Sequence, residues 1–121
     1  MPTPLLTPQA IVSLYYELVD AGKVDELLTL FHEDIVYERQ GTPDIHGIAA
    51  MRVFYEKERV IDEGRHELGQ LMSDGPWVAV RGRFEGRLKT GTQVRLRFTD
   101  WHRFRDGLID RRETLFPGLQ V

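Results

Sequence analysis

The segment RLRFTDWHRF, residues 95–104, places a carboxyl group among large apolar side chains. Alternate residues of a β-strand point to the same face, so Asp100 would share a face with Phe98 and His102. A carboxylate is costly to bury among apolar neighbours unless it is paired, hydrogen-bonded or protonated. Asp100 is therefore the first candidate for chemistry, either as an acid whose pKa is raised by burial or as the partner of a neighbouring arginine.

The composition limits the chemistry that is available. With 121 residues, 41% of them hydrophobic, the chain is expected to form a single domain over residues 1–121. The absence of cysteine excludes disulfides, thiolate metal sites and cysteine nucleophiles. His32, Glu33 and Asp34 are too closely spaced to build a metal site, and we expect no metal and no cofactor.

Charge and hydropathy limit the partners in the same way. The net charge of −3 argues against nucleic acid as the main partner. No apolar run approaches the length of a membrane span, and the N-terminus lacks the pattern of a secretory signal. We therefore expect a cytoplasmic protein whose partners are neither nucleic acid nor membrane.

Hydrophobic periodicity predicts helices in the first half of the chain and strands in the second. A helix is expected to begin at Thr7-Pro8 and to stop near Gly22. Two further helices and five strands are expected at residues 24–31 and 47–60, and at residues 34–41, 67–72, 77–88, 94–105 and 108–116. The order α-α-β-α-β-β-β-β predicts a cone-shaped α+β domain, in which helices pack on a curved mixed sheet and enclose a pocket.

This element order resembles that of a known superfamily, and three segments carry the resemblance: GKVDELLTLFHEDIVYE, GIAAMRVFYEK and FTDWHRFRDGLI. The chain resembles the nuclear transport factor 2-like superfamily, and within it the ketosteroid isomerases and the SnoaL-like polyketide cyclases. The similarity covers about residues 9–116. It implies a pocket for a small apolar carbonyl compound, although proteins with this fold perform many functions.

The resemblance also implies roles for individual residues. Tyr15 matches the oxyanion-hole tyrosine of the isomerases, Tyr55 a supporting tyrosine, and Asp100 an oxyanion-hole aspartate that is protonated. In that arrangement, Tyr15 and Asp100 would donate hydrogen bonds to a carbonyl oxygen that gains negative charge. The catalytic base of the family falls at Arg39, and an arginine cannot take a proton from carbon.

The missing base leaves several alternatives open. Glu38 could replace it, but strand alternation directs Glu38 to the face opposite Arg39 unless a bulge turns it inward. His102 could also act as a base near neutral pH. Arg39 could pair with an ionised Asp100 and lower its pKa, or it could bind a carboxylate or enolate of the substrate.

Two functions follow. The first is proton transfer of the isomerase or cyclase type, with Tyr15, Asp100 and Glu38 as catalytic residues. The second is a non-catalytic ligand-binding or dimeric accessory domain. Further candidates for contact with the substrate are Tyr55, Arg39, Phe98, His102, Arg112 and Thr114. We also expect a homodimer, because the other face of the same strand carries Trp101 and needs covering.

The family's epoxide hydrolases and cyclases suggest a further comparison. Their last-strand aspartate falls at Thr114 here, and the Arg-x-Asp segment of the hydrolases reads Arg81-Gly82-Arg83. Both carboxylates are missing, and this disfavours epoxide hydrolysis by that mechanism.

Overall fold

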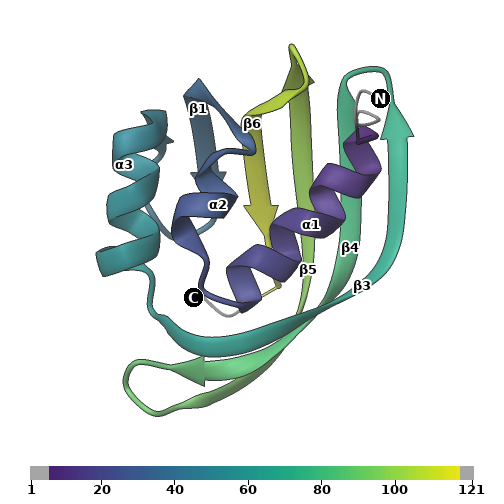
Figure 1. Ribbon diagram of the computed structural model, residues 1–121. Coiled ribbons are helices and arrows are strands. Elements are labelled where there is room, and N and C mark those ends of the chain that lie inside the picture. Colours follow the sequence, from purple (N-terminus) through teal and green to yellow (C-terminus); the bar gives the residue numbers. More distant parts are fainter. Residues whose placement is uncertain (1–5, 118–121) are drawn as a thin grey trace.

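A computed structural model describes residues 6–117 as helices packed against one strongly curved sheet (Figure 1). The elements in chain order are α1 (Pro8–Asp20), α2 (Val24–Leu28), β1 (Phe31–Arg39), β2 (Ile45–His46), α3 (Gly47–Val53), the π-helical turn η1 (Phe54–Glu58), β3 (Ile61–Asp74), β4 (Trp77–Leu88), β5 (Gln93–Arg105) and β6 (Leu108–Leu115). This arrangement confirms the predicted α+β class. Within these residues, no helix is long and apolar enough to cross a membrane.

The six strands lie in the order β2-β1-β6-β5-β4-β3. β1 and β6 are parallel and every other neighbouring pair is antiparallel, so the sheet is mixed as predicted. The parallel pair sets Tyr37 beside Arg112 and Arg39 beside Thr114. Residues from the two ends of the chain therefore meet on one face of the sheet.

The first helix begins and ends where the sequence predicts. The Thr7 hydroxyl accepts a hydrogen bond from the backbone N–H of Ala10 (3.1 Å), and Pro8 occupies the first turn. The chain then reverses through Gly22, whose positive φ of 71° glycine adopts without strain. Figure 1 shows α1 crossing the inner side of the curved sheet, where it contacts β3 and β4.

The short strand β2 was not predicted, and two boundaries differ most from the predictions. Phe31, predicted on the second helix, begins β1, because the chain leaves the helix after Leu28 and pairs with β6 at Ile109. β3 extends over Ile61–Asp74 instead of residues 67–72, since it pairs with β4 along almost the whole length of that strand. In both places the boundary is determined by pairing with a neighbouring strand and not by the weak secondary-structure preference of the local sequence.

The alternation predicted for β5 is confirmed. Phe98, Asp100 and His102 are buried under α1, whereas Thr99 and Trp101 are exposed on the outer face. The inner face of β5 is thus one wall of the core, and a carboxyl group lies within it.

Gly82 on β4 is a test of how tightly this curved sheet is packed. A Cβ atom at Gly82 would lie 2.4 Å from the carbonyl oxygen of Glu67 and 3.1 Å from the ring of Phe98. We expect Gly82→Ala to lower the free energy of unfolding by about 1–3 kcal/mol, because the backbone of β3 must move. Urea denaturation measures the loss, with the exposed neighbour Arg81→Ala as the control. Equal stability of the two variants would contradict the close approach of β3.

Candidate functional site

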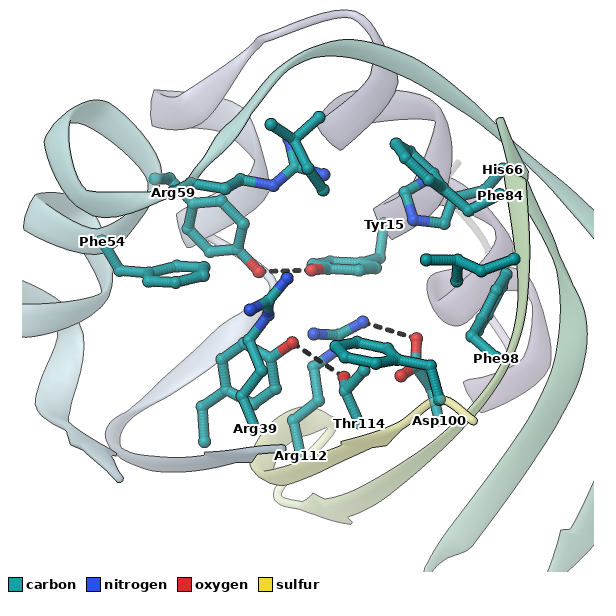
Figure 2. Close-up of a pocket in the computed structure, with 15 residues that line it drawn as sticks. Tyr15, Arg39, Phe54, Arg59, His66, Phe84, Phe98, Asp100, Arg112 and Thr114 are labelled. Atoms are coloured by element: carbon teal, nitrogen blue, oxygen red, sulfur yellow. Dashed lines mark hydrogen bonds and ion pairs between the residues drawn. The ribbon is translucent and has the colours of Figure 1, made fainter. Parts of the chain in front are cut away.

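A narrow cavity lies between α1, η1 and the inner face of the sheet (Figure 2). Its wall includes Tyr15 from α1, Arg39 from β1, Asp100 from β5, and Arg112 and Thr114 from β6. The free volume is about 40 Å³, room for only a few water molecules. Sites for organic ligands are several times larger, so a ligand would require side chains of the wall to move.

Asp100 and Arg112 form a buried ion pair at this wall. Arg112 Nη2 lies 2.6 Å from Asp100 Oδ2, and the Tyr16 hydroxyl donates to the same oxygen. Burial, the largest single influence, raises the pKa of Asp100, but the adjacent Arg112 guanidinium together with His102 and the hydroxyls of Thr114 and Tyr16 holds the pKa below its usual value. Asp100 is therefore ionised at neutral pH. Of the alternatives that the sequence left open, the structure has the carboxylate paired with a neighbouring arginine, and this arginine is Arg112 instead of Arg39.

The second carboxylate oxygen of Asp100 has no partner. Among the buried side-chain nitrogen and oxygen atoms of residues 6–117, Asp100 Oδ1 alone makes no hydrogen bond. Thr114 lies opposite on β6, and its hydroxyl, which is also hydrogen-bonded with that of Tyr37 (2.7 Å), is the nearest donor that favours the ionised form. A buried acceptor without a donor is costly. Oδ1 is shielded from the free volume of the cavity, so it can accept a hydrogen bond or a proton from a ligand only once side chains of the wall move.

Two tyrosine hydroxyls meet on the other side of the cavity. Those of Tyr15 and Tyr55 are hydrogen-bonded to each other, and the Arg112 guanidinium lies 4.4 Å from the centre of the Tyr15 ring. Burial raises the pKa of Tyr15 well above its usual value, and it also raises the pKa of Tyr55. Both hydroxyls therefore stay protonated; one of the two protons is used in the hydrogen bond between them, so the pair has one proton left to donate to a ligand oxygen.

Arg39 lines the cavity without an acidic partner. Its guanidinium carbon lies 5.4 Å from the ring centres of both Phe54 and Phe116, and the side chain is buried. In the described part of the chain, no carboxylate pairs with Arg39 or with Arg59, which lies on the same wall. The cavity therefore carries more positive than negative charge, which favours a ligand with an anionic or electron-rich oxygen.

The comparisons with known proteins fit this geometry. A family model described as a SnoaL-like domain matches residues 12–112. The chain belongs to the SnoaL-like family. The resemblance predicted from its sequence is thereby confirmed, and a search of proteins with curated functions found no significant match.

Solved structures similar to this SnoaL-like domain include three proteins with known chemistry or ligands. One is SalBIII, described as an epoxide hydrolase/cyclase-like enzyme in pyran ring formation in the polyether salinomycin; it is 27% identical, with a TM-score of 0.79 over 89% of this chain and 88% of that one. TerC, co-crystallised with polyporic acid, is 21% identical (TM-score 0.77, 88% of each chain). An LEH-like epoxide hydrolase of M. tuberculosis is 16% identical (TM-score 0.76, 88% of this chain and 79% of that one).

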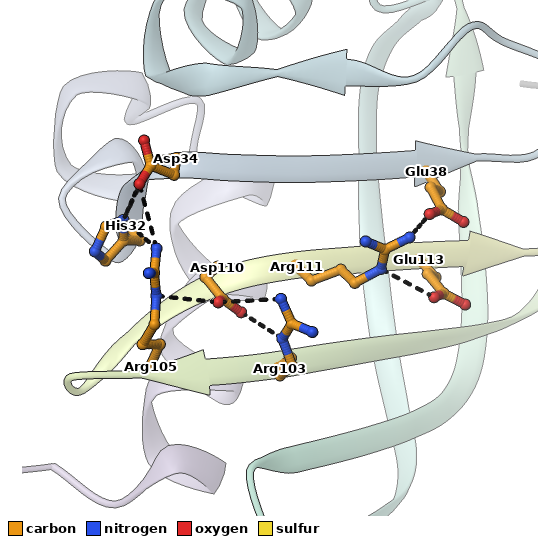
Figure 3. Close-up of polar contacts among 8 residues, drawn as sticks. All are labelled: His32, Asp34, Glu38, Arg103, Arg105, Asp110, Arg111 and Glu113. Carbon is orange, nitrogen blue, oxygen red and sulfur yellow. Dashed lines mark hydrogen bonds and ion pairs between the residues drawn. The ribbon is translucent and has the colours of Figure 1, made fainter.

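Glu38 does not reach the cavity of this SnoaL-like domain. It lies on the outer face of β1, where it forms an ion pair with Arg111 (Figure 3). Alternation along β1 places Arg39 inward and Glu38 outward, and no bulge turns Glu38 round. The candidate base is therefore separated from the cavity by the sheet.

His102 is buried behind Arg112 and is not part of the cavity wall. Its Nδ1 donates to the carbonyl oxygen of Val78 (3.2 Å), and its Nε2 accepts from Arg112 Nε (3.3 Å). Burial and the neighbouring guanidinium lower the pKa of His102 to about 4. The ring is neutral with both nitrogens occupied, so it positions Arg112 and does not act as a base.

The remaining candidates do meet in the cavity, and several neighbours were missed. Tyr55, Phe98, Arg112 and Thr114 line it as expected. Residues that the sequence did not single out also line it: Tyr37, Phe54, Arg59, Ile61, His66, Phe84, Leu96 and Phe116. Strand alternation could have identified Tyr37, two residues before Arg39, and Phe116, two after Thr114. No metal site is expected here, because the described residues contain no cluster of three His, Cys, Asp or Glu side chains.

Proposed function

We propose that this domain binds a small, largely apolar carbonyl compound and transfers a proton on it, as isomerases and cyclases do. The observation that carries the proposal is Asp100 Oδ1, a buried carboxylate oxygen without a hydrogen bond at the wall of the cavity. In this proposal Asp100 accepts the proton. Tyr15, which stays protonated, donates a hydrogen bond to the substrate oxygen.

The charges around Asp100 define the reaction that it could support. Arg112 lowers the pKa of the carboxyl and makes Asp100 a weak base. General bases work best when their pKa lies near the working pH, so a base this weak requires an unusually acidic C–H bond, such as a CH₂ between a carbonyl group and an aromatic ring. As the proton moves to Oδ1, the electron pair moves to the carbonyl oxygen, where Tyr15 and Arg39 stabilise the charge. The likeness to the cyclase-like SalBIII supports this class of reaction.

A second function is favoured by a different observation. Arg39 occupies the family's base position with no acidic partner in residues 6–117, and the cavity is small. These features suit a non-catalytic domain that holds an anionic ligand between Arg39 and Arg59. The homodimer and the cytoplasmic location stay predictions in either case.

Proton exchange on a simple ketone separates the two functions. The protein is incubated in D₂O with 2-tetralone, whose CH₂ between carbonyl and ring is acidic, and deuterium uptake is followed by NMR. We expect the wild type to accelerate the exchange and Asp100→Asn to lower that acceleration by about 10²-fold or more. Glu38→Gln, which removes a carboxylate on the outer face, is the matched control and should leave the rate unchanged.

Two outcomes would decide against proton transfer by Asp100. An Asp100→Asn variant that exchanges as fast as the wild type would remove Asp100 from the mechanism. A wild type that binds 4-nitrophenolate but accelerates no exchange would favour the non-catalytic function. In that case Arg39→Met should weaken the binding, because it removes one of the two cations without an acidic partner in residues 6–117.

A further inference from the structure

Asp20 and His66 form a hydrogen-bonded pair that joins α1 to β3. Asp20 Oδ1 lies 2.6 Å from His66 Nδ1, and Asp20 Oδ2 accepts the backbone N–H of His66 (2.8 Å). A carboxylate only accepts hydrogen bonds, so the proton of the neutral ring is on Nδ1. The lone pair of the ring is then on Nε2. The Asp20 carboxylate fixes the orientation of the imidazole ring relative to the backbone of β3.

His66 Nε2 is available to a ligand. No hydrogen bond to this atom is formed within residues 6–117, and it is not among the atoms cut off from solvent and cavity. His66 lines the same cavity as Tyr15 and Asp100. Figure 2 shows it beside Phe84, near the Tyr15 ring and on the same side of the cavity as Phe98.

Three aromatic rings pack against the His66 ring, and one of them also contacts Asp100. The His66 ring centre lies 4.8 Å from that of Phe84, 5.3 Å from that of Phe98 and 5.0 Å from that of Tyr16. Tyr16 also donates its hydroxyl to Asp100 Oδ2. One tyrosine thus spans the space between the imidazole and the carboxylate, and both lie at the wall of one cavity.

We propose that His66, oriented by Asp20, is a second acid/base group of this cavity. A histidine whose Nδ1–H is held by a carboxylate is well suited to take a proton at Nε2, because the carboxylate stabilises the imidazolium that forms. His66 Nε2 takes a proton from carbon, the electron pair of the C–H bond forms the C=C bond of an enolate while the π pair of the carbonyl moves to its oxygen, and the imidazolium returns the proton at a second atom as the carbonyl re-forms. Asp20 is a positioning residue.

Two acceptors in one cavity also define the substrate class. His66 Nε2 and Asp100 Oδ1 are both unpaired, and a ligand that satisfies both must present two protons. A carbonyl compound that also carries a hydroxyl group does so, with its hydroxyl at one acceptor and its acidic C–H at the other. This inference rests on the proposed function, because it uses the same cavity and the same kind of reaction.

Nitrogen-15 NMR tests the pair without requiring activity. We expect the His66 Nδ1 signal to report a bound proton, and the Nε2 signal to shift when 4-nitrophenol is added. Asp20→Asn should alter the tautomer populations of His66 and change the response of Nε2 to 4-nitrophenol. A role confined to joining α1 and β3 predicts no change in that response. A ring with its proton on Nε2, or one that does not respond to 4-nitrophenol, would overturn the inference.

The exchange of 2-tetralone supplies the second measurement. His66→Gln keeps a donor for Asp20 but loses the acid/base nitrogen, and it should lower the exchange rate by about 10²-fold. His32→Gln, on β1 and outside the cavity, is the matched control. Equal exchange by His66→Gln and wild type would overturn the role of His66 and leave that of Asp100 standing.

A failure of the proposed function gives a different pattern. If the wild type accelerates no exchange, proton transfer in this cavity is refuted. The contact between His66 and ligand is then judged by NMR alone: a shift of Nε2 with 4-nitrophenol supports it, and an unchanged signal overturns it.

Discussion

Replacement of Arg112 by methionine is expected to lower the free energy of unfolding by about 3–5 kcal/mol, the usual cost of leaving a buried charge without its partner. Asp100, 1% exposed, would keep its charge in the core and lose the guanidinium that lies 2.6 Å away. The variant would also lose the stacking of that guanidinium on Tyr15 and Tyr37. Urea denaturation at neutral pH measures the change.

A double variant separates the charge from the packing. Arg112→Met combined with Asp100→Leu removes both charges, and it should recover a large part of the stability lost in the single variant. Arg111→Met is the matched control, since Arg111 pairs with Glu38 and Glu113 on the half-exposed outer face. Such a pair is worth about 0.2–1 kcal/mol. A single variant as stable as the double would show that the buried pair is not what holds these strands.

Acidification from pH 7 to pH 4 is expected to cost about 3 kcal/mol of stability through His102 alone. The folded protein holds the pKa of His102 at about 4, whereas an unfolded chain has the ordinary value of 6.5. Between these values the unfolded state binds a proton that the folded state does not, so stability falls as the pH falls. Below pH 4 both states are protonated and this contribution is fully lost.

The comparison that isolates this effect uses His102→Gln, which keeps a donor for Val78 and has no titrating group. The variant is expected to be less stable than the wild type at pH 7, with the difference shrinking towards pH 4. Asp100 adds its own loss only at lower pH, because its pKa is below the ordinary value. A constant difference between variant and wild type from pH 7 to pH 4 would show that His102 titrates normally.

The inward face of β5 could be predicted, but the partner of Asp100 could not. A regular hairpin at Asp106-Gly107 would set Asp100 opposite Glu113 and direct Arg112 outward. The structure has a bulge between Arg103 and Phe104 that shifts the register by one residue and sets Asp100 opposite Thr114. Alternation within one strand shows which residues share a face, whereas the register between strands depends on an insertion that alternation does not reveal.

The bulge has a local cause that Figure 3 shows. Asp110 is the extra residue, and its buried carboxylate is held by Arg103 and Arg105 on the neighbouring strand. Although Asp110 lies close to a turn, its side chain is only 7% exposed. These two ion pairs help to fix the register that turns Arg112 towards Asp100.

The contacts between α1 and the sheet could not be predicted from the spacing of residues along the sequence either. Helical spacing marks Tyr15 as inward, and the resemblance to the isomerases pairs it with Tyr55. The contact of Tyr16 with Asp100 and that of Asp20 with His66 depend on the angle at which α1 crosses β3 to β5. That angle is set by the curvature of the sheet, which no single segment encodes.

The parallel pairing of β1 with β6 has a consequence for the newly made chain. β1 leaves the ribosome long before its neighbour β6 exists, and the pairing of Arg39 with Thr114 must wait for almost all of the remaining sequence. Contacts between such distant segments form late and slowly. Until then the edge of β1 that pairs with β6 in the folded protein has no partner.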